Sequence, residues 1–270
     1  MHRIDKLFQT KRKNILSIYF TAGYPFTDST TGIIKNLAMT GVDMIEIGMP
    51  FSDPLADGPM IQRSNEAALR NGMSISLLFK QLADIRNNVQ IPLILMGYIN
   101  PVLKFGIEEF CRKCNEVEID GVILPDLPPE TCLDLYPGLF EKYNLYNILL
   151  VSPQSDDGRI RMIDGISRGF VYMVSSSSTT GIRGVFSEDQ ISYFKRIKEM
   201  NLANPRLIGF GISDAGSFNA ACGVAEGAII GSAFIRMLGE GSADYENITS
   251  FIGKIRGYRE SLSARSNTFH

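Results

Sequence analysis

The sequence predicts an α/β fold, a TIM (β/α)8 barrel with a short extra helix at its N-terminus. Eight short runs of apolar or β-branched residues recur along the chain, and segments with helical periodicity separate them. Runs that are apolar nearly throughout are typical of parallel strands covered on both faces. The length of 270 residues also suits one such barrel, so we expect a single domain spanning residues 1–270. A doubly wound open sheet is the alternative, but it usually stops at five or six strands.

The positions of the elements follow from these patterns. We expect strands at residues 15–20, 44–48, 91–97, 121–126, 147–151, 170–175, 206–211 and 227–232. Helical patterns cover residues 28–40, 75–88, 106–117, 186–200 and 214–223. The first fourteen residues are charged and amphipathic without an apolar central run, which favours a leading helix over a secretory signal. The last eight residues, 263–270, read as a frayed tail.

Composition narrows the function classes. The net charge of −2 and the scattered Lys and Arg residues give no basic footprint for nucleic acid. No apolar run approaches the ~18 residues that span a bilayer, so we expect a soluble, cytoplasmic protein. The four cysteines are too few for a disulfide framework. Cys111 and Cys114 have the spacing of half a metal site, but no second pair completes it, so we expect helix packing and no metal.

Missing residue types limit the chemistry further. The only histidines are His2 and His270, at the extreme termini. Histidine general bases and histidine-ligated metals are therefore improbable. None of the eight expected strands contains a lysine, so a barrel-borne Schiff base has no candidate. Carboxylates and tyrosines remain for proton transfer, at the C-terminal ends of the strands where barrel chemistry takes place.

Glu46 is the strongest carboxylate candidate. In the run MIEIG, alternation puts Glu46 on the face opposite Ile45 and Ile47. If those isoleucines pack against the helices, Glu46 points into the barrel, where desolvation raises the pKa of its carboxyl toward neutrality. Such a group suits both acid and base roles. The alternative is a structural glutamate bonded to a neighbouring strand.

A stiff acidic loop follows this strand. Prolines at positions 50, 54 and 59 limit its conformations. Asp53 and Asp57 are both candidates for holding a carboxylate over a pocket, and the pattern does not rank them. The alternative is a solvated loop with turn-forming Asp-Pro and Asp-Gly steps.

Glycines at the ends of the last two strands predict a phosphate site. GFGISD spans residues 209–214, where Ser213 or Asp214 is placed to cap the next helix, and Gly231–Ser232 ends the eighth strand just before a short helix. Loops after strands 7 and 8, with the N-terminus of a short helix, form the recurring phosphate site of this fold. The alternative is that the glycines only permit tight turns. Residues 175–186 are small and polar and read either as a mobile lid or as an ordinary flexible loop.

The stretch EIGMPFSDPLADGP, residues 46–59, closely resembles the signature of the tryptophan synthase α chain family. Further stretches continue the resemblance over nearly the whole chain, at residues 20–25, 61–72, 95–106, 121–130, 180–181, 209–213 and 230–235. Members of that family are TIM barrels that cleave indole-3-glycerol phosphate to indole and glyceraldehyde 3-phosphate. The resemblance therefore implies a carbon–carbon lyase of tryptophan biosynthesis.

The resemblance also assigns roles to residues. It implies that Glu46 is the acid/base group and that Asp57, rather than Asp53, is the catalytic aspartate. It implies a substrate-binding set of Phe20, Tyr98, Leu124, Tyr172 and Thr180. It implies a phosphate-binding set of Gly181, Phe210, Gly211, Gly231 and Ser232.

Partners follow from the same resemblance. It implies a pyridoxal-phosphate β chain that receives the indole, an α2β2 heterotetramer, and no cofactor in this chain. The acidic loop then presents Asp57 inward and Asp53–Pro54 toward the partner. Two alternatives remain open: a stand-alone lyase that releases free indole, and a non-catalytic barrel that only regulates a β chain. A pure scaffold has no need of a buried acid, which argues against the second.

Overall fold

The computed structural model describes residues 1–175, 186–209 and 211–258. The predictions for Thr180, Gly181 and Phe210 lie outside this part of the chain, as do most of the predicted lid and the whole predicted tail.

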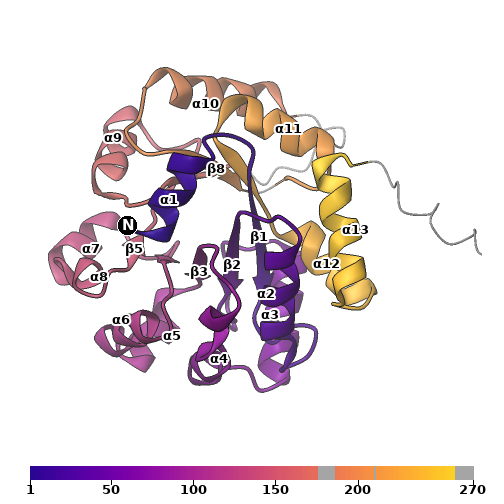
Figure 1. Cartoon of the computed structure of the whole chain (residues 1–270). Helices are drawn as coiled ribbons and strands as arrows, with labels where there is room; N and C mark the ends of the chain where they lie inside the picture. Colours follow the sequence, from indigo (N-terminus) through magenta and orange to yellow (C-terminus); the bar gives the residue numbers. More distant parts are fainter. Residues whose placement is uncertain (176–185, 210, 259–270) are drawn as a thin grey trace, which may run out of the picture.

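Parallel strands form the centre of the fold, and Figure 1 shows the helices arranged around them. The strands are β1 (Ile15–Thr21), β2 (Met44–Gly48), β3 (Leu93–Met96), β4 (Gly121–Ile123), β5 (Tyr146–Asn147), β6 (Leu150–Val151), β7 (Val171–Val174), β8 (Arg206–Gly209) and β9 (Gly227–Ile230). Their order in the sheet is β5-β4-β3-β2-β1-β9-β8-β7-β6. All pairings are parallel, as predicted.

The fifth predicted strand closes the barrel in two pieces. Its first half, β5, pairs with β4, and its second half, β6, pairs with β7. Between them the Ile148 amide donates to Val122 O (3.0 Å), and Leu149 O accepts from the Tyr172 amide (3.0 Å). One segment thus joins both ends of the sheet, which is the closed barrel that the sequence predicts.

The helices also follow the predicted pattern. They are α1 (Arg3–Thr10), α2 (Ser29–Met39), α3 (Pro59–Arg70), α4 (Ile75–Leu82), α5 (Ile99–Phe105), α6 (Ile107–Glu116), α7 (Pro129–Leu135), α8 (Leu139–Lys142), α9 (Asp157–Ile166), α10 (Glu188–Glu199), α11 (Ala215–Val224), α12 (Ser232–Glu240) and α13 (Tyr245–Arg256). The helix predicted over residues 75–88 ends early, at Leu82, and the 3-10 turn η1 (Ile85–Asn87) follows. Asp84 and Asn88 flank this turn, and both residue types have lower helix propensity than the leucines and lysine before them.

Side chains of each strand alternate between two apolar clusters. In β1, Ile15 and Tyr19 belong to the barrel interior, whereas Leu16, Ile18 and Phe20 belong to the barrel–helix layer, the cluster shared by the strands and the surrounding helices. Ile45 and Ile47 of β2 also lie in the barrel–helix layer, as the alternation predicts.

The remaining sequence expectations concern α1, the cysteines and membranes. The predicted leading helix is α1, whose fully buried Ile4 joins the interior cluster. Cys111 and Cys114 are buried on one side of α6, so the packing prediction is confirmed. Within residues 1–175, 186–209 and 211–258, no helix is long and apolar enough to cross a membrane.

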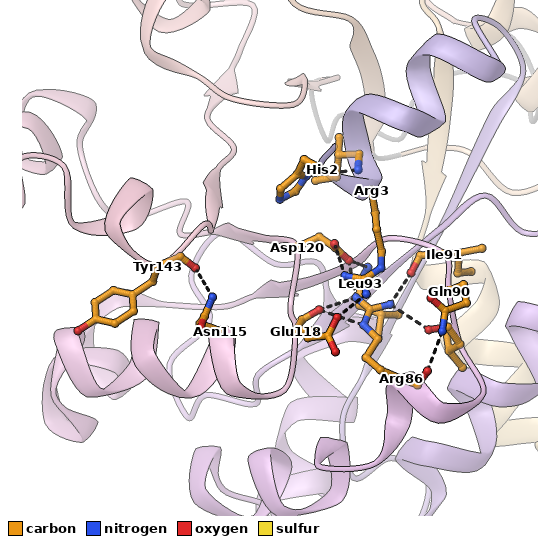
Figure 2. Close-up of polar contacts among 12 residues, drawn as sticks. His2, Arg3, Arg86, Gln90, Ile91, Leu93, Asn115, Glu118, Asp120 and Tyr143 are labelled. Atoms are coloured by element: carbon orange, nitrogen blue, oxygen red, sulfur yellow. Dashed lines mark hydrogen bonds and ion pairs between the residues drawn. The ribbon is translucent and has the colours of Figure 1, made fainter.

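An ion network around the buried Asp120 closes the end of the barrel at which the strands begin. Asp120, just before β4, accepts hydrogen bonds from the Leu93 amide (2.8 Å), from Arg3 Nη1 (3.2 Å) and from Arg86 Nη2. Figure 2 shows both guanidinium groups converging on this carboxylate. Arg86 Nε also donates to Glu118 O (3.0 Å). The network ties α1 to β3 and β4.

We expect Asp120→Asn to lower the free energy of unfolding by about 2–4 kcal/mol, because the buried Arg86 guanidinium then faces a neutral amide. The matched control is Glu118→Gln, which breaks the more exposed ion pair with Arg3 and is expected to cost less than about 1 kcal/mol. Urea denaturation measures both variants. Equal losses in the free energy of unfolding would show that the Asp120–Arg86 ion pair is no more stabilising than the exposed Glu118–Arg3 pair.

Candidate active site

Glu46 lies inside the barrel on β2, where its backbone pairs with Tyr19 of β1 and Ile94 of β3. The side chain is 0% exposed, and Ser17 Oγ donates to its Oε1 at 2.8 Å. Its Oε2 is buried and has no hydrogen-bond partner in the described part of the chain. Burial raises the pKa of the carboxyl to about 8, against the smaller opposing effect of Ser17. Glu46 is therefore mostly protonated at neutral pH.

Asp57 lies on the loop between β2 and α3, and a tyrosine from the next strand end holds it. The Tyr98 hydroxyl donates to Asp57 Oδ2 (3.2 Å) and accepts from the Ala56 amide (3.0 Å). Tyr98 is nearly buried and stacks at a tilt on Phe51, with ring centroids 5.1 Å apart. Burial raises the pKa of Asp57 to about 6, and the Tyr98 hydrogen bond opposes the rise. Asp57 is thus mainly ionised at neutral pH.

The two carboxyls differ in charge state at the same pH. Around pH 7 the interior acid, Glu46, retains its proton, while the loop acid, Asp57, has lost its own. Pairs of titratable groups whose surroundings push their pKa values apart are typical of acid/base sites. This pair can donate a proton from one group and stabilise positive charge with the other.

Two buried tyrosines complete the interior of the site. Tyr172, on β7, has a pKa well above its usual value, mainly through burial and further through the nearby Glu46 and Asp57. Burial also raises the pKa of Tyr19, with Asp57 next in effect. Glycines make room for both rings. A Cβ added at Gly209 would lie 2.0 Å from the Tyr172 hydroxyl oxygen, and one at Gly48 would lie 2.3 Å from that of Tyr19.

Two residues of the predicted substrate-binding set, Phe20 and Leu124, lie outside the interior cluster. Both side chains lie in the barrel–helix layer, so neither faces the barrel interior. Their chain neighbours Tyr19 and Ile123 belong to the interior cluster instead. Phe20 differs from Tyr19 by one residue within β1, and in a strand that step reverses the face. Leu124 follows Ile123, the last residue of β4. Contact of Phe20 and Leu124 with a substrate stays a prediction. The alternation that predicts an inward-facing Glu46 also predicts an inward-facing Tyr19, because Tyr19 pairs with Glu46 across β1 and β2.

We expect Tyr98→Phe to move the acidic limb of the pH–rate profile upward by up to about one pH unit, because the ionised Asp57 loses a hydrogen-bond donor. Activity then falls more at pH 6 than at pH 7.5. The matched control is Tyr143→Phe, whose hydroxyl donates to the exposed Glu108 (3.0 Å) and should leave the profile unchanged. If the acidic limb of the Tyr98→Phe profile stays at the same pH, Tyr98 does not stabilise the ionised form of Asp57.

The predicted phosphate glycines lie at two helix N-termini that differ in capping. At α11, the Asp214 carboxylate accepts from the Ser217 amide (2.8 Å) in a capping box, so a negative charge already occupies that end. At α12, the N-cap residue Gly231 supplies no side-chain hydrogen bond, and the exposed Ser232 is the first helical residue. Gly211 has φ +76°, and a Cβ there would meet only Ser175 Oγ, at 4.0 Å, among the described neighbours. The α12 end is therefore the better anion site.

The acidic loop also has an outer side. Asp53 is exposed, and Leu55 is 92% exposed. Pro54, which we expected to face outward with Asp53, is buried. It contributes to loop order instead, since Pro54 O accepts from the Asp57 amide at 3.0 Å.

Known proteins resemble this chain closely. A family model described as tryptophan synthase alpha chain matches residues 5–260. The tryptophan synthase alpha chain of Christiangramia forsetii is 54% identical over 256 residues, which are 95% of this chain and 99% of that one. The crystal structure of the alpha chain from Legionella pneumophila superimposes with a TM-score of 0.85 at 30% identity, covering 98% of this chain and 99% of that chain. Tryptophan synthase from M. tuberculosis, in its aminoacrylate-bound form, gives 0.83 at 29% identity, covering 96% and 100%.

Proposed function

Because this chain belongs to the tryptophan synthase α chain family, we propose that it cleaves indole-3-glycerol phosphate to indole and glyceraldehyde 3-phosphate. The observation that carries the proposal is the pair of carboxyls at the barrel mouth, Glu46 neutral and Asp57 ionised near pH 7. A retro-aldol cleavage of an indole needs one group of each kind.

The substrate explains why an acid must act first. The bond between C3 of the indole and C3′ of the side chain cannot break while the ring is aromatic, because its electron pair has no acceptor. Glu46 donates its proton to C3, which gives an indoleninium cation and a Glu46 carboxylate. That carboxylate then removes the C3′-hydroxyl proton. The C3–C3′ pair moves into the ring, C3′ becomes the aldehyde carbon, and Glu46 is protonated again.

Asp57 has a different task in this scheme. Its ionised carboxylate accepts a hydrogen bond from the indole N–H and stabilises the positive charge that develops on the ring. Tyr98 keeps the carboxylate in place through its 3.2 Å hydrogen bond. Tyr172 provides a buried wall near both acids and is proposed to contact the indole.

The substrate phosphate is proposed to bind at the N-terminus of α12. Gly231 and Ser232 supply backbone N–H groups there, and Gly211 permits close approach from the end of β8. Gly181 and Phe210 are proposed to add further backbone contacts, and Thr180 to meet Asp57, as the family resemblance implies.

We also propose that the indole passes to a pyridoxal-phosphate β chain within an α2β2 assembly. The exposed Asp53 and Leu55 lie on the same loop as Asp57, so one short segment is available to both the active site and a partner. The cleavage consists of proton transfers and the heterolysis of one C–C bond, with no external oxidant or reductant, and we therefore propose no cofactor in this chain.

The test is indole release from indole-3-glycerol phosphate, measured with and without a β chain. The proposed function predicts turnover by this chain alone and a strong gain in rate with the partner. Turnover without any gain would indicate a stand-alone lyase. No turnover in either case would indicate a non-catalytic barrel and would overturn the proposal.

A further inference from the structure

We propose that Ser17 is a positioning residue, which holds Oε1 of Glu46 and thereby makes Oε2 the oxygen that exchanges protons with the substrate. The inference rests on the proposed function, since it assigns a task within the same cleavage. It starts from the hydrogen bond that Ser17 Oγ donates to Oε1 of the Glu46 side chain at 2.8 Å.

The backbone fixes this contact from two neighbouring strands. Ser17 is on β1 and Glu46 on β2, and the parallel register places Ser17 opposite Met44 and Tyr19 opposite Glu46. Both side chains are 0% exposed and point into the barrel interior. Groups held on paired strands are located more accurately than groups on loops. The Ser17 hydroxyl is therefore a fixed reference point for the Glu46 carboxyl.

Apart from Glu46, the paired-strand neighbours of Ser17 are apolar. On the other side of β1, Ser17 pairs with Ile229 of β9, and both Met44 and Ile229 belong to the apolar interior cluster. A buried hydroxyl without a hydrogen bond destabilises the fold. An apolar side chain would fill the same place without that penalty. Among the described residues, the carboxyl of Glu46 is the group that accepts from this hydroxyl and so offsets its burial.

The second oxygen of the Glu46 carboxyl, Oε2, is left without a hydrogen bond among the described residues. This oxygen is also buried. Buried polar atoms are usually paired, so an unpaired oxygen at a barrel mouth indicates a partner that arrives with the substrate. We place the proton of the neutral carboxyl on Oε2, which leaves Oε1 as the carbonyl oxygen that accepts from Ser17. The same serine then stabilises the carboxylate formed after C3 has been protonated.

Ser17→Ala is expected to lower kcat for indole release about 10- to 100-fold, the size of one hydrogen bond to a charged group, with KM changed less than about 3-fold. Loss of the donor also destabilises the ionised form of Glu46, so the alkaline limb of the pH–rate profile moves to higher pH. Ser17→Thr keeps a hydroxyl at the same place and should restore most of the rate and the original limb.

Ser167→Ala is the matched control, because Ser167 is also a buried serine but its hydroxyl bonds backbone atoms within the described ranges, Phe170 O (2.9 Å) and the Leu149 amide (3.2 Å). It should leave the alkaline limb in place. If Ser17→Ala does not fold, Ser17→Cys takes its place, because a thiol is a weak hydrogen-bond donor. Ser17→Cys is then compared with Ser17→Thr, which keeps a hydroxyl donor. Unchanged kcat and an unmoved limb in the folded Ala or Cys variant would overturn the inference. Failure of the proposed function is distinct, because the unsubstituted chain would then release no indole.

Discussion

Glu46→Gln is expected to lower kcat for indole release by at least about 10³-fold while the protein remains folded. Positioned proton transfer contributes about 10²–10⁴-fold, and this one carboxyl both protonates C3 and deprotonates the C3′-hydroxyl. Glutamine has nearly the same shape and can accept the Ser17 hydrogen bond, but it donates no acidic proton. Steady-state indole release measures the loss, and circular dichroism checks the fold.

The same substitution changes the dependence of stability on pH. The pKa of Glu46 is raised from 4.5 to about 8 in the folded protein, so the folded state binds the extra proton between these values. Stability from this group is complete below pH 4.5 and is lost as the pH rises through 8. Glu46→Gln removes the loss, and the variant should exceed the unsubstituted protein in free energy of unfolding at pH 9 by more than about 1 kcal/mol. Near-full activity of Glu46→Gln would contradict a buried neutral acid at this position. So would a difference in free energy of unfolding between the variant and the unsubstituted protein that is the same at pH 5 and at pH 9.

Asp57→Asn is expected to lower kcat by about 10²–10³-fold, the usual effect of removing one group aimed at developing charge. Asparagine keeps the size of the side chain and an oxygen that accepts from Tyr98, but it cannot balance the positive charge of the protonated indole. The loss should be largest near pH 7, where Asp57 is ionised, and smaller below pH 6, where Asp57 is itself neutral.

Asp53→Asn is the matched control for this substitution. Asp53 lies on the same loop but is exposed, and its carboxylate contacts Ser52. It should leave cleavage by the isolated chain within about 3-fold, because exposed charges contribute little, while reducing the gain in rate on adding a β chain. Equal losses in the two variants without a partner would show that the loop as a whole, rather than Asp57, supports the chemistry.

Much of this fold could be predicted because parallel strands leave a plain sequence pattern. The apolar runs located the strand that carries Glu46, and their alternation placed that side chain in the interior. Phe20 and Leu124, which the family resemblance places in the pocket, belong to the barrel–helix layer, and their chain neighbours Tyr19 and Ile123 belong to the interior cluster.

Other features depend on contacts between distant segments and leave no local signal. The sequence ranks Asp53 and Asp57 equally, whereas in the structure Asp57 is more buried and accepts a hydrogen bond from the Tyr98 hydroxyl, 41 residues away. The role of Ser17 likewise depends on its contact with Glu46, 29 residues on. The break in the fifth strand reflects barrel closure, in which one segment must pair with two strands.

The most direct test of a neutral Glu46 acting beside an ionised Asp57 is the pH dependence of kcat/KM for indole release by the isolated chain. The profile should be bell-shaped, with an acidic limb near pH 6 as Asp57 ionises and an alkaline limb near pH 8 as Glu46 loses its proton. A profile that stays flat from pH 5 to pH 9, or that rises through pH 8, would contradict this assignment of acid and base.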